Sequence, residues 1–192
     1  MRILIVTLML TMLLGCSSNQ AEKHYFQLTS DFSQSQDRLI AHKTNQGIFI
    51  EPVQVASYLD TTGIVYQLDE VQFTTTTQNV WLTPLSDQLQ NRLNVDLANL
   101  WSNYNVTSSP INNPKATIQL YVDTFQGSYT GDALLQGHWV ITQQNKQTIT
   151  KKFDYKIPLR EAGYPALVKA LSKGLQEEVI DMVRGSGIRN SD

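Results

Sequence analysis

The stretch ATIQLYVD, residues 116–123, alternates apolar side chains with polar or aromatic ones. This period of two is typical of a β-strand with one face turned toward a core. The alternation returns in LLQGHWVI (134–141), and a third candidate strand, TITKKFDYKIPL, spans 148–159. Turn-forming stretches at 127–131 and 145–146 separate the three segments. Because short connections join antiparallel neighbours, the sequence predicts a three-stranded antiparallel meander.

A helical pattern precedes the meander. Thr83 is the expected N-cap, Pro84 the first helical residue, and Asp87 lies where the helix dipole is positive. An apolar stripe at spacings of three, four or one then predicts a helix with one face against a sheet. The residues of this stripe are Leu85, Leu89, Leu93, Leu97, Leu100 and Trp101.

A second helix is predicted from about Pro165 to Arg184, ending at Gly185. Ala166, Ala170 and Gly174 form a row of small side chains beside its apolar face. We interpret this row as tight packing against the sheet, with a partner-binding groove as the alternative. The expected apolar face consists of Leu167, Leu171, Leu175, Val179, Met182 and Val183.

The amino-terminal half supplies further strands. HYFQLT (24–29) predicts a short strand, and residues 30–45 are polar and predict a loop. GIFIEPVQVASYL (47–59) is apolar on both faces, which is typical of a strand in the middle of a sheet. TGIVYQLDEVQF (62–73) predicts one more strand, with a possible extension through threonines 74–77. The predicted fold is therefore α+β, one antiparallel or mixed sheet with two amphipathic helices mainly on one face.

Composition restricts the function. At 192 residues the chain suits one domain, since halving it would leave two marginal cores. The formal net charge is −2 and no sequence block concentrates Lys or Arg, so nucleic-acid binding is not expected. The single cysteine, Cys16, excludes a disulfide within the chain.

Cys16 lies in MLLGCSSNQ (12–20), at the end of an uncharged segment too short to span a bilayer. LLGC resembles the bacterial lipobox, which implies a diacylglyceryl group and an N-acyl chain such as palmitate on Cys16. The alternative is an ordinary signal peptide with a stray cysteine. Ser17, where Asp is the usual inner-membrane retention signal, favours the outer membrane, with the domain facing the periplasm.

These features divide the chain into four parts. Residues 1–15 are the expected lipoprotein signal peptide and residues 16–22 a lipidated tether. Residues 23–185 form the expected folded domain, and residues 186–192 a polar tail. Three acyl chains would hold Cys16 firmly in a membrane, because each buried CH₂ contributes about 0.8 kcal/mol.

Catalytic motifs are missing from the sequence. His24, His42 and His138 are far apart and form no metal-ligand pair, and His138 is expected to face solvent. The adjacent carboxylates Glu177–Glu178 and Asp69–Glu70 are expected to be solvated surface charges. There is no G-x-S-x-G elbow, P-loop or G-x-G-x-x-G. We therefore expect no enzyme activity, no catalytic residue, no metal and no cofactor.

Residues 48–101 contain an ordered set of motifs: Pro52, Tyr58-Leu59-Asp60, Ile64-Val65, Trp81, Pro84 and Leu85, with Trp139 beyond them. This set resembles the ABC-type transport auxiliary lipoproteins, the PqiC/YmbA-like family. Gln67 stands where the family pattern has a basic residue, and Leu82–Thr83 replaces Ala-Glu. The family implies an outer-membrane lipoprotein that works with an MCE-domain lipid transport protein as a docking or exit component and not as a catalyst. The resemblance also raises a homo-oligomeric ring as an arrangement of copies of the chain.

Tyr58 and Asp60 are candidate partner contacts, since the resemblance is strongest around them. The alternatives are that Tyr58 and Leu59 cap the core and that Asp60 organises the following turn, which we prefer for Asp60. Two rival functions stay open. One is an outer-membrane assembly lipoprotein of the lipopolysaccharide-translocon type, and the other is a lipid-tethered periplasmic hydrolase.

Overall fold

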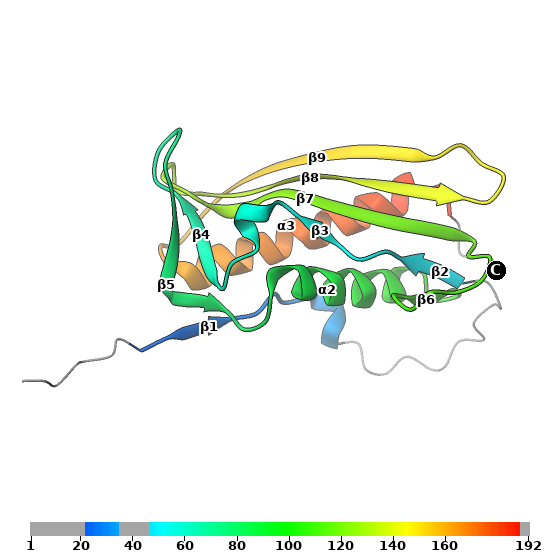
Figure 1. Ribbon diagram of the computed structural model, residues 1–192, viewed down its shortest axis with the longest axis horizontal. Helices are drawn as coiled ribbons and strands as arrows, with labels where there is room; N and C mark the ends of the chain where they lie inside the picture. Colours follow the sequence, from blue (N-terminus) through cyan, green and yellow to red (C-terminus); the bar gives the residue numbers. More distant parts are fainter. Residues whose placement is uncertain (1–21, 35–46, 189–192) are drawn as a thin grey trace, which may run out of the picture.

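Strand β7 (Ala116–Ser128) is the centre of the sheet in the computed structural model, which describes residues 22–34 and 47–188 (Figure 1). β8 (Asp132–Gln143) pairs with it antiparallel, and β9 (Ile149–Pro158) pairs antiparallel with β8. The predicted meander is therefore confirmed. The first turn is tighter than predicted, because β7 continues through Ser128 and Gly131 turns the chain at φ 81°.

The other edge of β7 is covered by three parallel strands in succession: β2 (Gly47–Ile50), β3 (Gln54–Val55) and β4 (Gly63–Gln67). The prediction of one strand over 47–59 is wrong in its continuity. Pro52 has no N–H to donate to a ladder, and the 3-10 helix η3 (Ser57–Leu59) turns the chain after β3. β2 lies between β7 and β6 (Asn105–Thr107), in the central position that its two apolar faces predict.

The prediction of one strand over residues 62–73 is also wrong, because the chain reverses at residues 68–72. Asp69 Oδ1 accepts from the backbone N–H groups of Val71 (2.8 Å) and Gln72 (2.7 Å) and closes this turn. The returning strand β5 (Phe73–Trp81) pairs antiparallel with β4. β1 (His24–Phe26), shorter than expected, adds to β5 in parallel.

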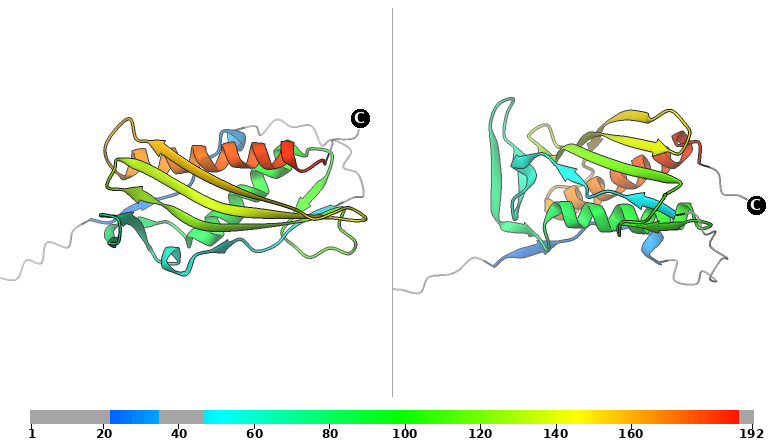
Figure 2. Two further views of the ribbon diagram at one scale, coloured as in Figure 1. Left: turned by 90° about the horizontal axis from the view of Figure 1, so that it is seen from above. Right: turned by 45° about the vertical axis from the view of Figure 1, so that its right-hand side comes forward.

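Helices α2 (Leu85–Leu100) and α3 (Tyr164–Gly185) lie on the same face of the nine-stranded mixed sheet that the described residues form (Figure 2). The α+β fold is therefore confirmed. Pro84, not Thr83, is the N-cap of α2, and the Thr83 carbonyl instead accepts from the Gln88 side chain at 3.0 Å. α3 extends one residue beyond the prediction at each end, and Ser186 is its C-cap.

The row of small residues on α3 divides into two parts. Gly174 is buried, and a Cβ there would lie 2.6 Å from Ile157 Cδ1, so β9 packs closely on the helix at this level. Ala166 and Ala170 are only half-buried. Tight packing thus holds for Gly174 and leaves the first two turns of α3 open.

Glu178 corrects the expectation that its pair of carboxylates is solvated. Its side chain is buried beneath the sheet and accepts a hydrogen bond from Trp139 Nε1 at 2.7 Å. Tyr155 of β9 donates to the same carboxylate. Burial raises the pKa of Glu178, while these two hydrogen bonds lower it. Glu177 is exposed, as predicted.

The segment after β1 is fixed to both helices by polar contacts. The backbone N–H of Leu28 donates to Gln88 Oε1 (2.9 Å), and that of Thr29 donates to Ser172 Oγ (3.1 Å). Ser30 Oγ donates to Asp96 at 2.5 Å, and Arg92 pairs with the same carboxylate at 2.7 Å. These contacts hold the start of the domain on the helical face.

Residues 31–34 within the predicted 30–45 loop form the 3-10 helix η2 (Asp31–Gln34), and the remainder lies outside the described residues. None of the described helices combines the length and apolar character needed to cross a membrane.

Candidate docking surface

Tyr58 sits on η3, immediately above the sheet. Its hydroxyl donates to Gln126 Oε1 (2.9 Å) and lies 3.0 Å from the Asp123 carbonyl oxygen, both on β7. Partial burial raises the pKa of Tyr58. The side chain is nevertheless 40% exposed, whereas its neighbour Leu59 is buried. Leu59 thus caps the core as predicted, while the ring of Tyr58 stays accessible.

The β4–β5 hairpin continues this accessible surface. The rings of Tyr58 and Phe73 lie 5.9 Å apart at a tilted angle, and Val71 at the tip is 86% exposed. The backbone N–H of Tyr129 donates to the Gln67 carbonyl (2.9 Å), which places the β7–β8 turn beside the hairpin. We call the exposed apolar residues of this region the hairpin patch: Tyr58, Leu68, Val71, Phe73 and Tyr129.

The hairpin projects from the sheet on the side away from α2 and α3 (Figure 1). Its tip therefore stands clear of the body, and water surrounds side chains that would be stable in a core. Monomeric proteins rarely expose such groups together, so clustered exposed apolar residues mark a binding surface.

The charges on the β4–β5 hairpin have one sign. The sequence contains no Lys or Arg between Lys43 and Arg92, and Asp69 and Glu70 directly precede Val71 at the tip. Anionic membrane lipids attract basic segments and repel acidic ones. Acidic residues beside exposed apolar side chains are instead suited to a protein partner that carries basic residues.

Asp60 lies at the edge of this surface. Its backbone N–H donates to the Ser57 carbonyl (3.2 Å), and its side chain is exposed. The following turn is held by Thr61 Oγ1, which donates to the Gly63 carbonyl at 3.0 Å. Partner contact by Tyr58 and Asp60 stays a prediction that the geometry permits.

The remaining sequence candidates contribute no second site. Cys16 and His42 lie outside the described residues, so lipidation of Cys16 stays a prediction. His24 is exposed, and His138 is half-buried, with its ring stacked on Tyr121 at 4.4 Å. Among residues 22–34 and 47–188, no cluster of His, Cys, Asp or Glu could hold a metal ion.

The sequence does not single out Leu68, Val71 and Phe73 as functional residues, because the prediction of one strand over residues 62–73 includes all three. The signal was the pair Asp69–Glu70 within an otherwise apolar run. Neighbouring side chains of a strand point to opposite faces of the sheet, so one of two adjacent carboxylates would have to face the core. The pair therefore favours a turn at this point.

Comparison with known proteins agrees with this architecture. The family model described as "ABC-type transport auxiliary lipoprotein component" matches residues 26–183. "Intermembrane transport lipoprotein PqiC" of Escherichia coli (strain K12) is 31% identical over 180 residues, covering 94% of this chain and 95% of the relative. The protein of the same name from Shigella flexneri matches with the same identity and coverage.

Solved structures share the fold. A crystal structure of an uncharacterized protein superposes with a TM-score of 0.74 at 29% identity, covering 86% of this chain and 99% of that chain. A protein from Xanthomonas campestris superposes with a TM-score of 0.64 at 12% identity, covering 83% and 92%. Taken with the family match over residues 26–183, this chain belongs to the ABC-type transport auxiliary lipoprotein family, as the resemblance of residues 48–101 predicted.

Proposed function

We propose that this chain is an outer-membrane lipoprotein that docks on an MCE-domain protein of an intermembrane lipid transport system and has no catalytic role of its own. Its family and its likeness to an intermembrane transport lipoprotein support an auxiliary role in transport. The MCE partner, the outer membrane and the periplasmic orientation of the domain belong to the proposal.

The observation that carries the docking role is the hairpin patch. It combines projection from the body, exposed aromatic and aliphatic side chains, and the adjacent carboxylates of Asp69 and Glu70. Aromatic residues at the centre of an interface supply much of its binding energy, and Phe73 and Tyr58 are already in contact. The partner is expected to offer an apolar hollow with basic residues at its rim.

Lipidation at Cys16 would set the height of this surface above the membrane. Lys23 is the seventh residue after Cys16, and an extended chain of that length reaches at most about 25 Å. The domain would therefore stay close to the membrane while the hairpin remains free to engage a protein that spans the periplasm.

Val71→Asp in the full-length lipoprotein tests the proposal. Val71 is 86% exposed, so a charge there leaves the free energy of unfolding nearly unchanged while placing a desolvated carboxylate in any interface. We expect co-purification of the MCE protein from membranes to fall at least about tenfold, which corresponds to about 1.4 kcal/mol. Thr150→Asp, on an exposed position of β9, is the matched control and should bind normally.

Tyr58 is a poorer probe of docking, because its hydroxyl donates a hydrogen bond to Gln126 and its substitution would also disturb the fold. Normal co-purification of the Val71→Asp variant would remove the hairpin patch from the docking role. Recovery of a lipopolysaccharide translocon protein in place of an MCE protein would support the rival assembly function. A change of particle mass without loss of the MCE protein would instead place the patch between copies in a homo-oligomeric ring.

A further inference from the structure

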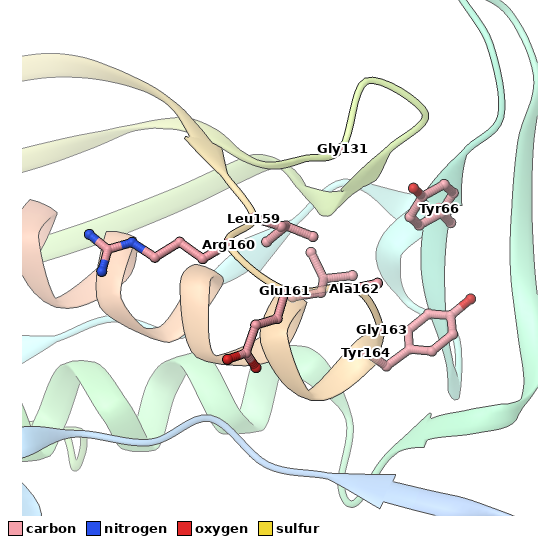
Figure 3. Close-up of a pocket in the computed structure, with 9 residues that line it drawn as sticks. Tyr66, Gly131, Leu159, Arg160, Glu161, Ala162, Gly163 and Tyr164 are labelled. Carbon is pink, nitrogen blue, oxygen red and sulfur yellow. The ribbon is translucent and has the colours of Figure 1, made fainter.

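Two adjoining hollows meet at the loop between β9 and α3. The first, about 490 Å³, lies between this loop and Tyr66 of β4, with Tyr164 beside it (Figure 3). The second, about 590 Å³, lies between the end of β9 and the first turns of α3. Leu159, Arg160 and Glu161 line both hollows, so the two form one surface, which we call the α3 groove.

Small and aliphatic side chains form the walls of the second hollow. Ala166 and Ala170 leave open the space that larger side chains on α3 would fill, and Ile157 and Leu159 face them from β9 and the loop. Lys173 is the last helical residue of this lining, and at Gly174, the next residue, β9 approaches the helix closely. The result is a groove, open to solvent, that is lined by both aliphatic and charged side chains.

Three of the residues that line the second hollow are basic. Lys169 and Lys173 stand one helical turn apart on α3, and Arg160 extends along the helix, away from Tyr66 and Tyr164 (Figure 3). Glu161 is the single acidic residue among the side chains that line the second hollow, which leaves a formal local charge of +2. Lys173 is 75% exposed, and its contact with Glu177 is long, at 3.9 Å, so its ammonium group can turn toward a ligand.

We propose that the α3 groove binds an anionic phospholipid, with acyl carbons against Ile157, Leu159 and Ala170. The phosphate would lie among Arg160, Lys169 and Lys173, whose charged N–H groups form strong hydrogen bonds to phosphate oxygens. The groove's volume is within the range of about 300–1,000 Å³ found for small-molecule sites. This inference deepens the proposed transport role by naming a ligand class, and it concerns a different surface from the hairpin patch.

An acidic peptide fits the groove less well. Residues 166–173 of α3 span about 10 Å at 1.5 Å per residue. Recognition of a peptide helix needs anchors over at least two turns of the ligand, at positions i, i+3, i+4 and i+7. The aliphatic and basic residues that α3 contributes to the groove all lie within residues 166–173, a short span that suits a single phosphate with its acyl chains better than a peptide.

Photocrosslinking of the full-length lipoprotein in cells tests the proposal. Benzoylphenylalanine replaces Glu161, an exposed residue that lines both hollows, in cells grown with radiolabelled phosphate. We expect a phosphate-labelled adduct whose mass is that of a diacyl phospholipid. The same photoreactive residue in place of Thr150, exposed on β9 outside the groove, should give none.

Charge variants supply the decisive comparison. Arg160→Gln, Lys169→Gln and Lys173→Gln together should lower the adduct yield at least about tenfold, since three charge-assisted contacts are lost. Lys151→Gln with Lys152→Gln, exposed on β9 away from the groove, should leave the yield unchanged. Co-purification of the MCE protein should persist in the triple variant, which separates this inference from the docking proposal.

Three outcomes would overturn the inference. They are an adduct with a protein or a lipopolysaccharide, equal yields with and without the three basic side chains, and absence of an adduct when the photoreactive chain is shown to be full length. Loss of partner binding in the Val71→Asp variant with a persisting phospholipid adduct would leave both proposals intact.

Discussion

The hairpin patch and the α3 groove adjoin the same strand, β4, yet they have opposite shapes and charges. Tyr66 lines the groove, and the hairpin tip begins two residues later at Leu68. The patch projects and its tip carries Asp69 and Glu70, whereas the groove is concave and its rim carries Arg160, Lys169 and Lys173. Apolar exposure alone does not distinguish them, since both present aliphatic side chains to solvent.

This difference indicates two kinds of ligand. A projecting apolar surface can be desolvated only by a partner that supplies its own hollow, which is a property of proteins. A groove lined by aliphatic side chains can hold an acyl chain, and its basic residues favour a ligand that carries a phosphate. One end of the sheet could thus bind a protein and a lipid without competition between them.

The largest expected effect is the difference in stability between a variant of the buried residue below the hairpin patch and a variant of the exposed tip. Leu59→Ala removes a fully buried side chain below Tyr58 and should lower the free energy of unfolding by about 2–5 kcal/mol. Val71→Ala, at the exposed tip, should change it by less than about 0.5 kcal/mol. Thermal and denaturant unfolding of the two variants measures the contrast. Equal losses would mean that Val71 packs in a core and that the patch is not free to bind.

The sequence predicts more of the helical and meander regions than of this end of the molecule. Alternation in β7 and β8 and the leucine stripe of α2 depend on local spacing, and the structure buries these predicted faces except at Leu100, which is half-buried. The sequence does not predict the hairpin, because Leu68, Val71 and Phe73 are as apolar as the residues of a buried strand, although the structure exposes them. Only the tertiary position of the Asp69 turn, beyond the end of the sheet, leaves them exposed.

The groove could not be predicted either, because its basic residues come from separate elements. Arg160 follows β9, while Lys169 and Lys173 lie on α3, and no sequence block concentrates them. The burial of Glu178 has the same origin. Its partners, Trp139 and Tyr155, are on β8 and β9, and only the packing of α3 under the sheet brings them together.

A matched pair of leucine substitutions sharpens the description of the groove. Gly174→Leu adds a side chain where β9 contacts the helix and should cost about 1–3 kcal/mol of stability through overpacking. Ala170→Leu places the same side chain one turn earlier, in open space, and should leave stability within about 0.5 kcal/mol. Ala170→Leu should nevertheless abolish the phospholipid adduct by filling the groove. A stability loss in Ala170→Leu as large as that in Gly174→Leu would contradict an open groove.

The smallest expected effect is a dependence of stability on pH that arises at Glu178 and does not change ligand binding by the groove. Burial raises the pKa of Glu178, so the folded protein holds this proton more tightly than the unfolded chain does. The stability that Glu178 contributes is therefore full below the unfolded carboxyl pKa of 4.5 and declines as the pH rises through the folded pKa. Asp132 acts in a different window, because hydrogen bonding to Thr130 and the charge of Lys156 lower its pKa below 3.8.

Glu178→Gln isolates this effect. Glutamine keeps an oxygen acceptor for Trp139 Nε1 but cannot ionise, so the fall in melting temperature between about pH 5 and pH 7 should be smaller in the variant than in the wild type. At pH 5 the two proteins should differ by less than about 1 kcal/mol, because the hydrogen bond is retained. Glu178 does not line the groove, so capture of phospholipid by the variant should match that by the wild type. Identical pH slopes for the two proteins would mean that burial does not raise the pKa of Glu178 in the folded protein.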